Sequence, residues 1–245
     1  MTSFLEFFQT TVGAITHEKR PLVDMDAMTS IRSAMIKFNQ ERVSTIPIFK
    51  PALPTSEPTL CYGGRCYIGM ISMTDIVVYI MGFASSIIAQ EGSGKTVQEC
   101  LNDPVEAVIG CSRESGVYFG MSVTYEDAPL SSVVDSMCVG KRIATYKNSP
   151  DCRAYRTGMH RCLICGTSGQ PPRVLTQTDI VKFFLANVGV HPQISVALSR
   201  AVGSISHSTE LVSVFEYSPV MRAFEKMQTL SALAVVNLSG ISEAL

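Results

Sequence analysis

Two short segments of the chain carry the same order of polar side chains: a hydroxyl residue, any residue, a second hydroxyl residue and an aspartate. They are Ser72-Met-Thr74-Asp75 and Thr176-Gln-Thr178-Asp179. A carboxylate at such a place can accept hydrogen bonds from both hydroxyls of a ribose, and a helix N-terminus can hold a phosphate. The same residues also suit a simple helix cap. Because the order is identical in both segments, we favour a shared ligand at both places.

Three basic residues accompany the second segment. His160 and Arg161 precede an apolar run, and Arg173 stands where the first copy has Gly69. A guanidinium offers several donors in one plane, which suits phosphate, and a histidine can add another donor. A solvated strand end is the alternative interpretation of His160 and Arg161. A backbone with Arg173 in place of glycine approaches a ligand less closely, so the second site is expected to differ from the first.

The elements that must position these residues recur in one order. In the first copy an amphipathic helix precedes strands at 45–49 and 66–71 and a helix that opens at Thr74. The stripe expected on the first helix is Met28, Ile31, Met35 and Phe38. In the second copy a helix from Pro129 precedes strands at 161–165 and 173–176 and a helix that opens at Thr178. A third copy has a helix after Pro219 and a strand at 232–236, lacks the aspartate, and is expected to be incomplete.

This repeat resembles the cystathionine β-synthase (CBS) domain from about Lys19 onward. The segments Gly158-Met-His160-Arg161-Cys-Leu and 174–184 are similar to the gamma regulatory subunit of the AMP-activated protein kinase family. The resemblance implies an α/β (α+β) fold of tandem strand-helix-strand-strand-helix units paired as a Bateman module. It also implies clefts that accept AMP, ADP or ATP, with Ser72, Thr74, Asp75, His160, Arg161, Arg173, Thr176, Thr178 and Asp179 as the binding residues.

The expected domain boundaries follow from the repeat. They are an N-terminal helical segment at 1–19, CBS unit 1 at 20–91, a linker at 92–118, CBS unit 2 at 119–189, a linker at 190–212 and a partial CBS unit 3 at 213–245. The predicted function is adenine-nucleotide sensing by a kinase gamma-type regulatory subunit. The alternative is an interaction scaffold of CBS units that binds no nucleotide.

Composition narrows the classes of partner. With 17% charged residues and a net charge of -1, the chain lacks the basic excess that nucleic-acid binding requires. The most apolar window, 76–89, is too short to cross a bilayer and is expected to be a buried helix. No secretory signal is visible, so a cytoplasmic or nuclear location is expected. The expected protein partners are a kinase catalytic or scaffold subunit, in a homodimer or hetero-oligomer.

Other motifs do not indicate an enzyme or a metal site. The eight cysteines are expected to be reduced thiols. Cys162 and Cys165, with Cys61 and Cys66, offer zinc ligands by type, but 161–165 is expected to be a buried strand whose alternate side chains point to opposite faces. The run Glu91–Thr96 resembles the end of a P-loop without its first glycine, and we interpret it as a linker. We therefore predict no catalytic residues, no metal and no cofactor beyond the nucleotide ligand.

Overall fold

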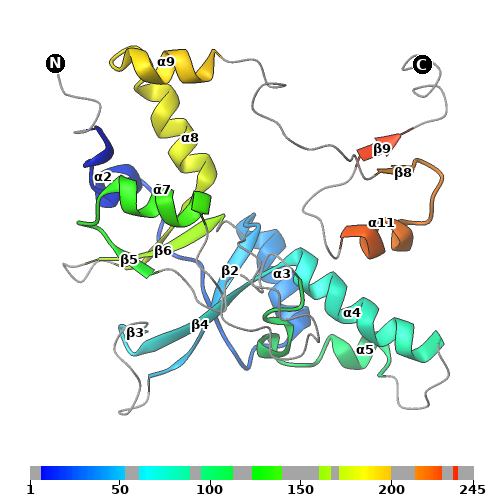
Figure 1. Cartoon of the computed structure of the whole chain (residues 1–245). Helices are drawn as coiled ribbons and strands as arrows, with labels where there is room; N and C mark the ends of the chain where they lie inside the picture. The colour runs from blue at the N-terminus through cyan, green and yellow to red at the C-terminus, as the bar shows by residue number, and fades with distance from the viewer. Residues whose placement is uncertain are drawn as a thin grey trace, which may run out of the picture. The chain divides into compact units, whose positions relative to one another are not determined.

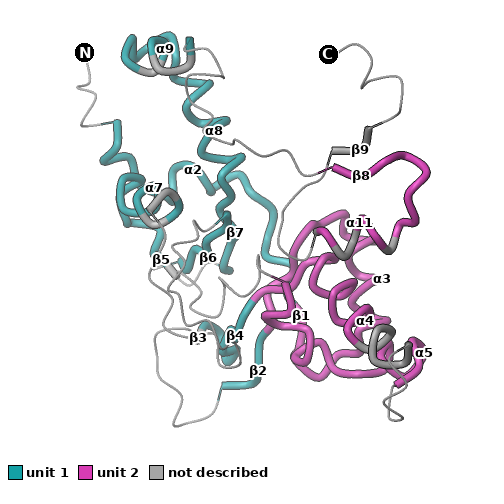
Figure 2. The backbone as a smooth tube through the Cα atoms, turned by 45° about the vertical axis from the view of Figure 1, so that its right-hand side comes forward, with its two compact units in different colours: residues 1–24, 49–69, 117–205 teal, residues 25–48, 70–116, 206–245 magenta. Residues whose placement is uncertain are grey.

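The computed structural model describes residues 7–52, 61–88, 95–112, 123–139, 160–166, 171–199, 213–227 and 234–236 (Figure 1). The chain divides into two compact units, each assembled from separate stretches of sequence (Figure 2). Unit 1 comprises residues 1–24, 49–69 and 117–205, and unit 2 comprises residues 25–48, 70–116 and 206–245. Because each unit draws on distant parts of the sequence, the units do not coincide with consecutive halves of the chain.

Unit 1 contains the second copy of the repeat. Its elements are α2 (Val12–Thr16), β5 (Val123–Tyr125), α7 (Leu130–Val139), β6 (Arg161–Cys165), β7 (Arg173–Thr176), α8 (Gln177–Ala186) and α9 (Pro192–Leu198). The sheet order is β5-β6-β7, with β5 parallel and β7 antiparallel to β6. The strand-helix-strand-strand-helix order predicted for this copy is confirmed, and both predicted strands have the expected bounds.

The core of unit 1 is formed by side chains of α2, α7, β6, β7 and α8. Its buried side chains are Val12, Leu130, Val133, Met137, Cys162, Ile164, Leu175 and Ile180. Each large aliphatic side chain that is fully buried contributes roughly 1.5–3 kcal/mol relative to an exposed one. The helix predicted from Pro129 and the buried strand predicted at 161–165 therefore supply five of the eight core side chains.

Unit 2 contains the first and third copies. The first copy is formed by β1 (Met25–Asp26), α3 (Ile31–Glu41), β2 (Thr45–Pro51), β4 (Arg65–Ser72) and α4 (Met73–Ile88), followed by α5 (Val97–Cys100) and the 3-10 helix η2 (Val105–Val108). Residues 49–51 of β2 and 65–69 of β4 are counted in unit 1. The third copy contributes β8 (Ser213–Phe215), α11 (Val220–Met227) and β9 (Ala234–Val236), with β8 parallel to β9. Residues 237–245, which include the predicted end of the third copy, lie outside the described residues.

The first helix of unit 2 corrects one sequence expectation. Met28 lies in a turn before α3 and is 72% exposed, so it does not belong to the buried stripe. The helix begins after Ser30, whose Oγ accepts a hydrogen bond from the Ser33 backbone N–H at 3.3 Å. Serine is a strong N-cap residue, and this cap starts the helix three residues later than the apolar spacing suggests. The buried face is Ile31, Ala34 and Phe38.

The strands of the first copy belong to a four-stranded sheet of order β1-β2-β4-β3, where β3 is Cys61–Tyr62. In the antiparallel β3–β4 pair, Cys66 lies opposite Cys61. Cys66 is disulfide-bonded, which corrects the expectation that all cysteines are reduced. Sequence spacing alone does not reveal that Cys66 forms a disulfide.

Each unit also holds a short segment that precedes the other copy in the sequence. In unit 1 this is residues 10–19: the Val12 N–H donates to Ala128 O at 2.9 Å, and the Leu130 N–H donates to Thr10 O at 2.8 Å. These bonds tie the segment to the start of α7. We call residues 10–19 the leading segment of unit 1.

Residues 103–112 make the matching contacts in unit 2, at the start of α3. The Val105 N–H donates to Thr29 O at 2.8 Å, and the Ile31 N–H donates to Asp103 O at 2.9 Å. Val12 and Val105 are both fully buried. Residues 103–112 are therefore the leading segment of unit 2, although the sequence assigns them to a linker.

No helix within the described residues is long and apolar enough to cross a membrane.

Candidate functional site

The N-terminus of α8 is built as a capping box. Thr176 ends β7 and is the N-cap residue, and its Oγ1 accepts a hydrogen bond from the Asp179 backbone N–H at 3.3 Å. In return, Asp179 Oδ2 accepts from the Thr176 backbone N–H and from Thr176 Oγ1, both at 2.7 Å. This reciprocal arrangement satisfies helix N–H groups that have no partner within the helix. The capping role weighed in the sequence analysis is thus present.

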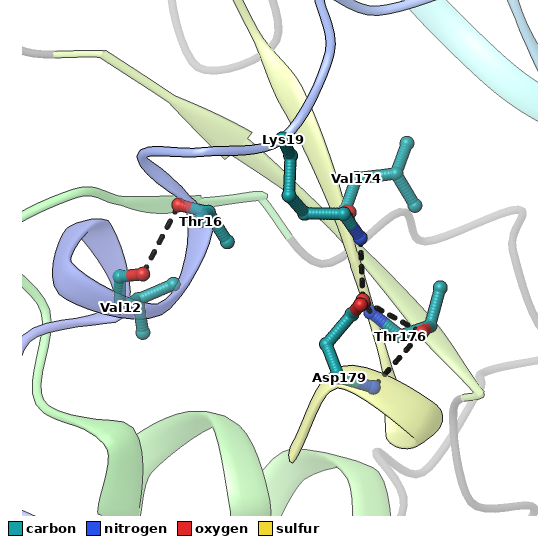
Figure 3. A network of polar contacts seen from close by, with 6 residues as sticks. All are labelled: Val12, Thr16, Lys19, Val174, Thr176 and Asp179. Carbon is teal, nitrogen blue, oxygen red and sulfur yellow. Dashed lines mark hydrogen bonds and ion pairs between the residues drawn. The ribbon is translucent and has the colours of Figure 1, made fainter. Parts of the chain in front are cut away.

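Lys19 from the leading segment reaches the same carboxylate (Figure 3). Its ammonium lies 2.5 Å from Asp179 Oδ2 and 2.5 Å from Val174 O. Burial by itself raises the pKa of the Asp179 carboxyl, but the hydrogen bonds from Lys19 and Thr176 outweigh burial and hold that pKa below its ordinary value. Asp179 is therefore ionised at neutral pH and fixed through one of its two oxygens.

The other oxygen, Asp179 Oδ1, is the open part of this site. Every hydrogen bond to the carboxylate falls on Oδ2, and no donor among the described residues bonds to Oδ1. The Asp179 side chain is 20% exposed. An ionised oxygen that is held in place and accepts no hydrogen bond from the described residues is a strong acceptor for a ligand hydroxyl.

Four predicted binding residues lie near Asp179 at the same end of the β6–β7 pair. Arg161 is the register partner of Thr176, and the Gln177 backbone N–H donates to His160 O at 3.1 Å. His160 and Thr178 are exposed, and Arg161 is half-buried. The structure therefore brings His160, Arg161, Thr176, Thr178 and Asp179 to one helix N-terminus.

Arg173 is placed elsewhere. It lies at the far end of β7, opposite Ile164, and its guanidinium pairs with Glu126 Oε1 at 3.3 Å. Its side chain is only 14% exposed. Three residues of extended strand separate it from Thr176, which is about 10 Å. The structure therefore does not bring Arg173 to the N-terminus of α8 with the other predicted residues.

The first copy forms the same capping box with a different third donor. Asp75 Oδ2 accepts from the Ser72 N–H at 2.7 Å and from Ser72 Oγ at 2.6 Å. Asp75 Oδ1 accepts from the Ser112 backbone N–H at 2.9 Å. Asp75 is fully buried and Ser72 nearly so, whereas Thr74 is half-buried. Both oxygens of this carboxylate are thus used inside unit 2.

Lys19 and Ser112 occupy matching positions, and neither was predicted from the sequence. Lys19 follows Val12 by seven residues, and Ser112 follows Val105 by seven residues. Lys19 provides a side-chain ammonium and Ser112 provides a backbone N–H. The two leading segments therefore share no residue type at this position. The only available signal was the paired spacing from a buried valine.

Two further motifs of the sequence have structural roles. Lys95, from the P-loop-like run, bonds both oxygens of Asp103 at 2.7 and 2.9 Å, while residues 89–94 lie outside the described residues. Cys162 and Cys165 are buried in β6. Among the described residues, no group of three or more His, Cys, Asp or Glu is arranged to hold a metal ion.

The fold can be compared with known proteins. The chain matches no protein-family model and no curated protein sequence. It is similar in structure to protein MJ1225 from Methanocaldococcus jannaschii, a proposed archaeal homologue of g-AMPK, with a TM-score of 0.58 and 13% identity. That match covers 92% of this chain and 66% of MJ1225, so the chain spans about two thirds of its length.

Two CBS-domain structures show weaker similarity. ATU1752 from Agrobacterium tumefaciens has a TM-score of 0.43 and 11% identity, over 71% of this chain and 93% of that one. PAE2072 from Pyrobaculum aerophilum, complexed with AMP, has a TM-score of 0.40 and 11% identity, over 74% and 99%. Taken with the repeated strand-helix-strand-strand-helix order, the likeness to MJ1225 shows that the chain has the fold of a tandem CBS-domain protein.

Proposed function

We propose that the chain is a regulatory protein that binds an adenine nucleotide at the N-terminus of α8. The observation that carries the proposal is the open oxygen of Asp179. A ribose diol needs an ionised acceptor that is held in place. The Thr176 N–H holds the Asp179 carboxylate, its side chain is 20% exposed, and no described residue donates to Oδ1. AMP, ADP and ATP all present the same diol, so the proposal covers the three of them.

The surrounding residues supply donors for the phosphate. The first turn of α8 carries backbone N–H groups and the positive end of the helix dipole, and Thr178 is exposed there. His160 and Arg161 lie alongside the same turn and add donors that suit an anion. The acceptor for the diol and the donors for the phosphate thus lie at the same end of the β6–β7 pair.

The corresponding place in unit 2 supports binding less well. Asp75 is fully buried and both of its oxygens already accept hydrogen bonds. A ligand would have to break the bond from Ser112 before it could use this carboxylate. We therefore propose that Ser72, Thr74 and Asp75 act mainly as a structural cap, and that residues 160–161 and 176–179 form the working site.

The proposed role is that of a gamma-type subunit that reports nucleotide level to a kinase catalytic or scaffold subunit in the cytoplasm or nucleus. Its support is the fold shared with MJ1225, the proposed g-AMPK homologue. Such a role requires the nucleotide to favour one arrangement of the protein over another.

Isothermal titration calorimetry with AMP, ADP, ATP and S-adenosylmethionine tests the proposal. We expect at least one adenine nucleotide to bind the wild-type chain with a Kd below 1 mM, a limit of about -4 kcal/mol. Asp179→Asn should weaken that binding at least about tenfold, because it replaces the acceptor at Oδ1 with an amide donor. Millimolar or weaker binding of all four ligands contradicts the proposal.

A scaffold without nucleotide binding is the second candidate, and one observation favours it. Leu185 of α8 is 57% exposed, whereas Met81, at the matching position of α4, is 3% exposed. Val181 lies one turn before Leu185 and is 51% exposed, so the two form an apolar strip on α8. Sedimentation velocity of the wild-type chain and of Leu185→Lys tests this role. Self-association that the variant abolishes, in protein that binds no nucleotide, would support it.

A further inference from the structure

Lys19 is the one charged side chain that the leading segment of unit 1 directs at the proposed site. Its ammonium contacts Val174 O and Asp179 Oδ2, and no other acceptor among the described residues bonds to it (Figure 3). A lysine ammonium has three N–H donors, so one donor stays available. The Lys19 side chain is 28% exposed.

Unit 2 has a different donor at the matching position. There the Ser112 backbone N–H donates to Asp75 Oδ1. A lysine side chain adds what a backbone N–H cannot supply: a positive charge on a flexible four-carbon stem. That charge also partly neutralises Asp179 while no ligand is bound.

From this geometry we propose that Lys19 is a specificity-determining residue that makes the site select phosphorylated nucleosides over bare nucleosides. The inference rests on the proposed nucleotide site. A nucleoside supplies the diol for Asp179 Oδ1 but leaves the ammonium where it is. A nucleotide also supplies a phosphate anion, which attracts the ammonium through its available N–H and leaves the Asp179 carboxylate more negative for the diol.

Calorimetry with AMP and with adenosine on the wild type and Lys19→Met measures this preference. In the wild type we expect AMP to bind at least about tenfold more tightly than adenosine, since a charge-assisted hydrogen bond contributes roughly that much. Methionine keeps the length and apolar volume of the lysine stem but removes the charge. In Lys19→Met the AMP affinity should fall, and the adenosine affinity should remain unchanged or rise. The ratio of AMP affinity to adenosine affinity should therefore approach one.

Two control variants separate charge from packing. Lys19→Arg keeps a cation and should keep the preference for AMP. Lys95→Met removes a lysine of unit 2 that is ion-paired with Asp103 in a similar way, and it should leave both affinities unchanged. Thermal unfolding of every variant by circular dichroism verifies that each is folded before its affinities are compared.

The outcomes are distinguishable. An unchanged ratio of AMP to adenosine affinity in Lys19→Met overturns the role of Lys19 but leaves the nucleotide site standing. An equal gain for both ligands also overturns it, because Lys19 would then only block the carboxylate. If neither ligand binds the wild type or Lys19→Met, the proposed function itself fails and this inference fails with it.

Discussion

Asp75 and Asp179 occupy the same place in two copies of one motif, and each completes the same capping box. They differ in the donor that the leading segment brings to them. A backbone N–H from Ser112 occupies Asp75 Oδ1 and the carboxylate is fully buried. Lys19 instead shares Asp179 Oδ2 with the cap, no described residue donates to Oδ1, and the side chain is 20% exposed. We therefore propose that the leading segment, which lies outside the motif, decides whether such a cap can also bind a ligand.

The largest expected difference is in stability. Asp75→Asn places an amide NH₂ against donors that need both carboxylate oxygens, so at least one buried N–H loses its partner. We expect it to lower the free energy of unfolding by about 2–3 kcal/mol. Asp179→Asn can keep its one oxygen on the cap and turn its NH₂ to the open side. It loses only the charge pair with Lys19, about 1 kcal/mol.

Urea unfolding of both variants measures this difference from the midpoints and slopes. Equal losses in the free energy of unfolding would contradict the proposed difference between the two carboxylates. A smaller loss for Asp75→Asn than for Asp179→Asn would mean that the Asp179 carboxylate is the more important one for stability.

A second pair of variants isolates the part that the two copies share. Ser72→Ala and Thr176→Ala each remove the hydroxyl that caps the following helix, and each should cost about 1 kcal/mol. In a chain of 245 residues this corresponds to a drop in Tm of roughly 2–4 °C. Differential scanning calorimetry should show drops of similar size. A drop confined to one variant would mean that only one copy relies on its cap.

The smallest expected effect is a change in the pKa of Asp179. Because the pKa of Asp179 is lowered in the folded chain, its contribution to stability is complete above about pH 4 and is lost as pH falls through the lowered pKa. Lys19→Met removes one cause of the lowering, so the pKa of Asp179 should rise in the variant. Carboxyl-carbon NMR through the acid range follows this change. An Asp179 pKa unaffected by Lys19→Met would mean that the ion pair is not formed in solution.

Much of the fold could be predicted from local patterns. The strands at 161–165 and 173–176 were predicted with the observed bounds because apolar runs there are bracketed by turn residues and polar ends. Apolar spacing alone placed Met28 in the first helix, since it does not show where a serine cap starts the helix. The disulfide at Cys66 was missed because the local sequence does not show which cysteine the fold brings close to Cys66.

The candidate site could be predicted only in part. The motif identified Asp75 and Asp179, and the strand pairing at Thr176 shows why His160 and Arg161 lie near the second. Lys19 and Ser112 could not be found from residue type, because the long-range contacts that bring them in depend on how the leading segments pack. Arg173 has a suitable side chain for phosphate, but its ion pair with Glu126 holds it at the other end of β7.

The most direct test of the central claim is a crystal structure of the chain with AMP. The account predicts electron density for AMP at the N-terminus of α8, with a ribose hydroxyl bonded to Asp179 Oδ1 and the phosphate near His160, Arg161 or Lys19. It also predicts that Asp75 keeps its bond from Ser112 and binds no nucleotide. AMP bound through Asp75, or bound in unit 1 without contact to Asp179, would contradict the account.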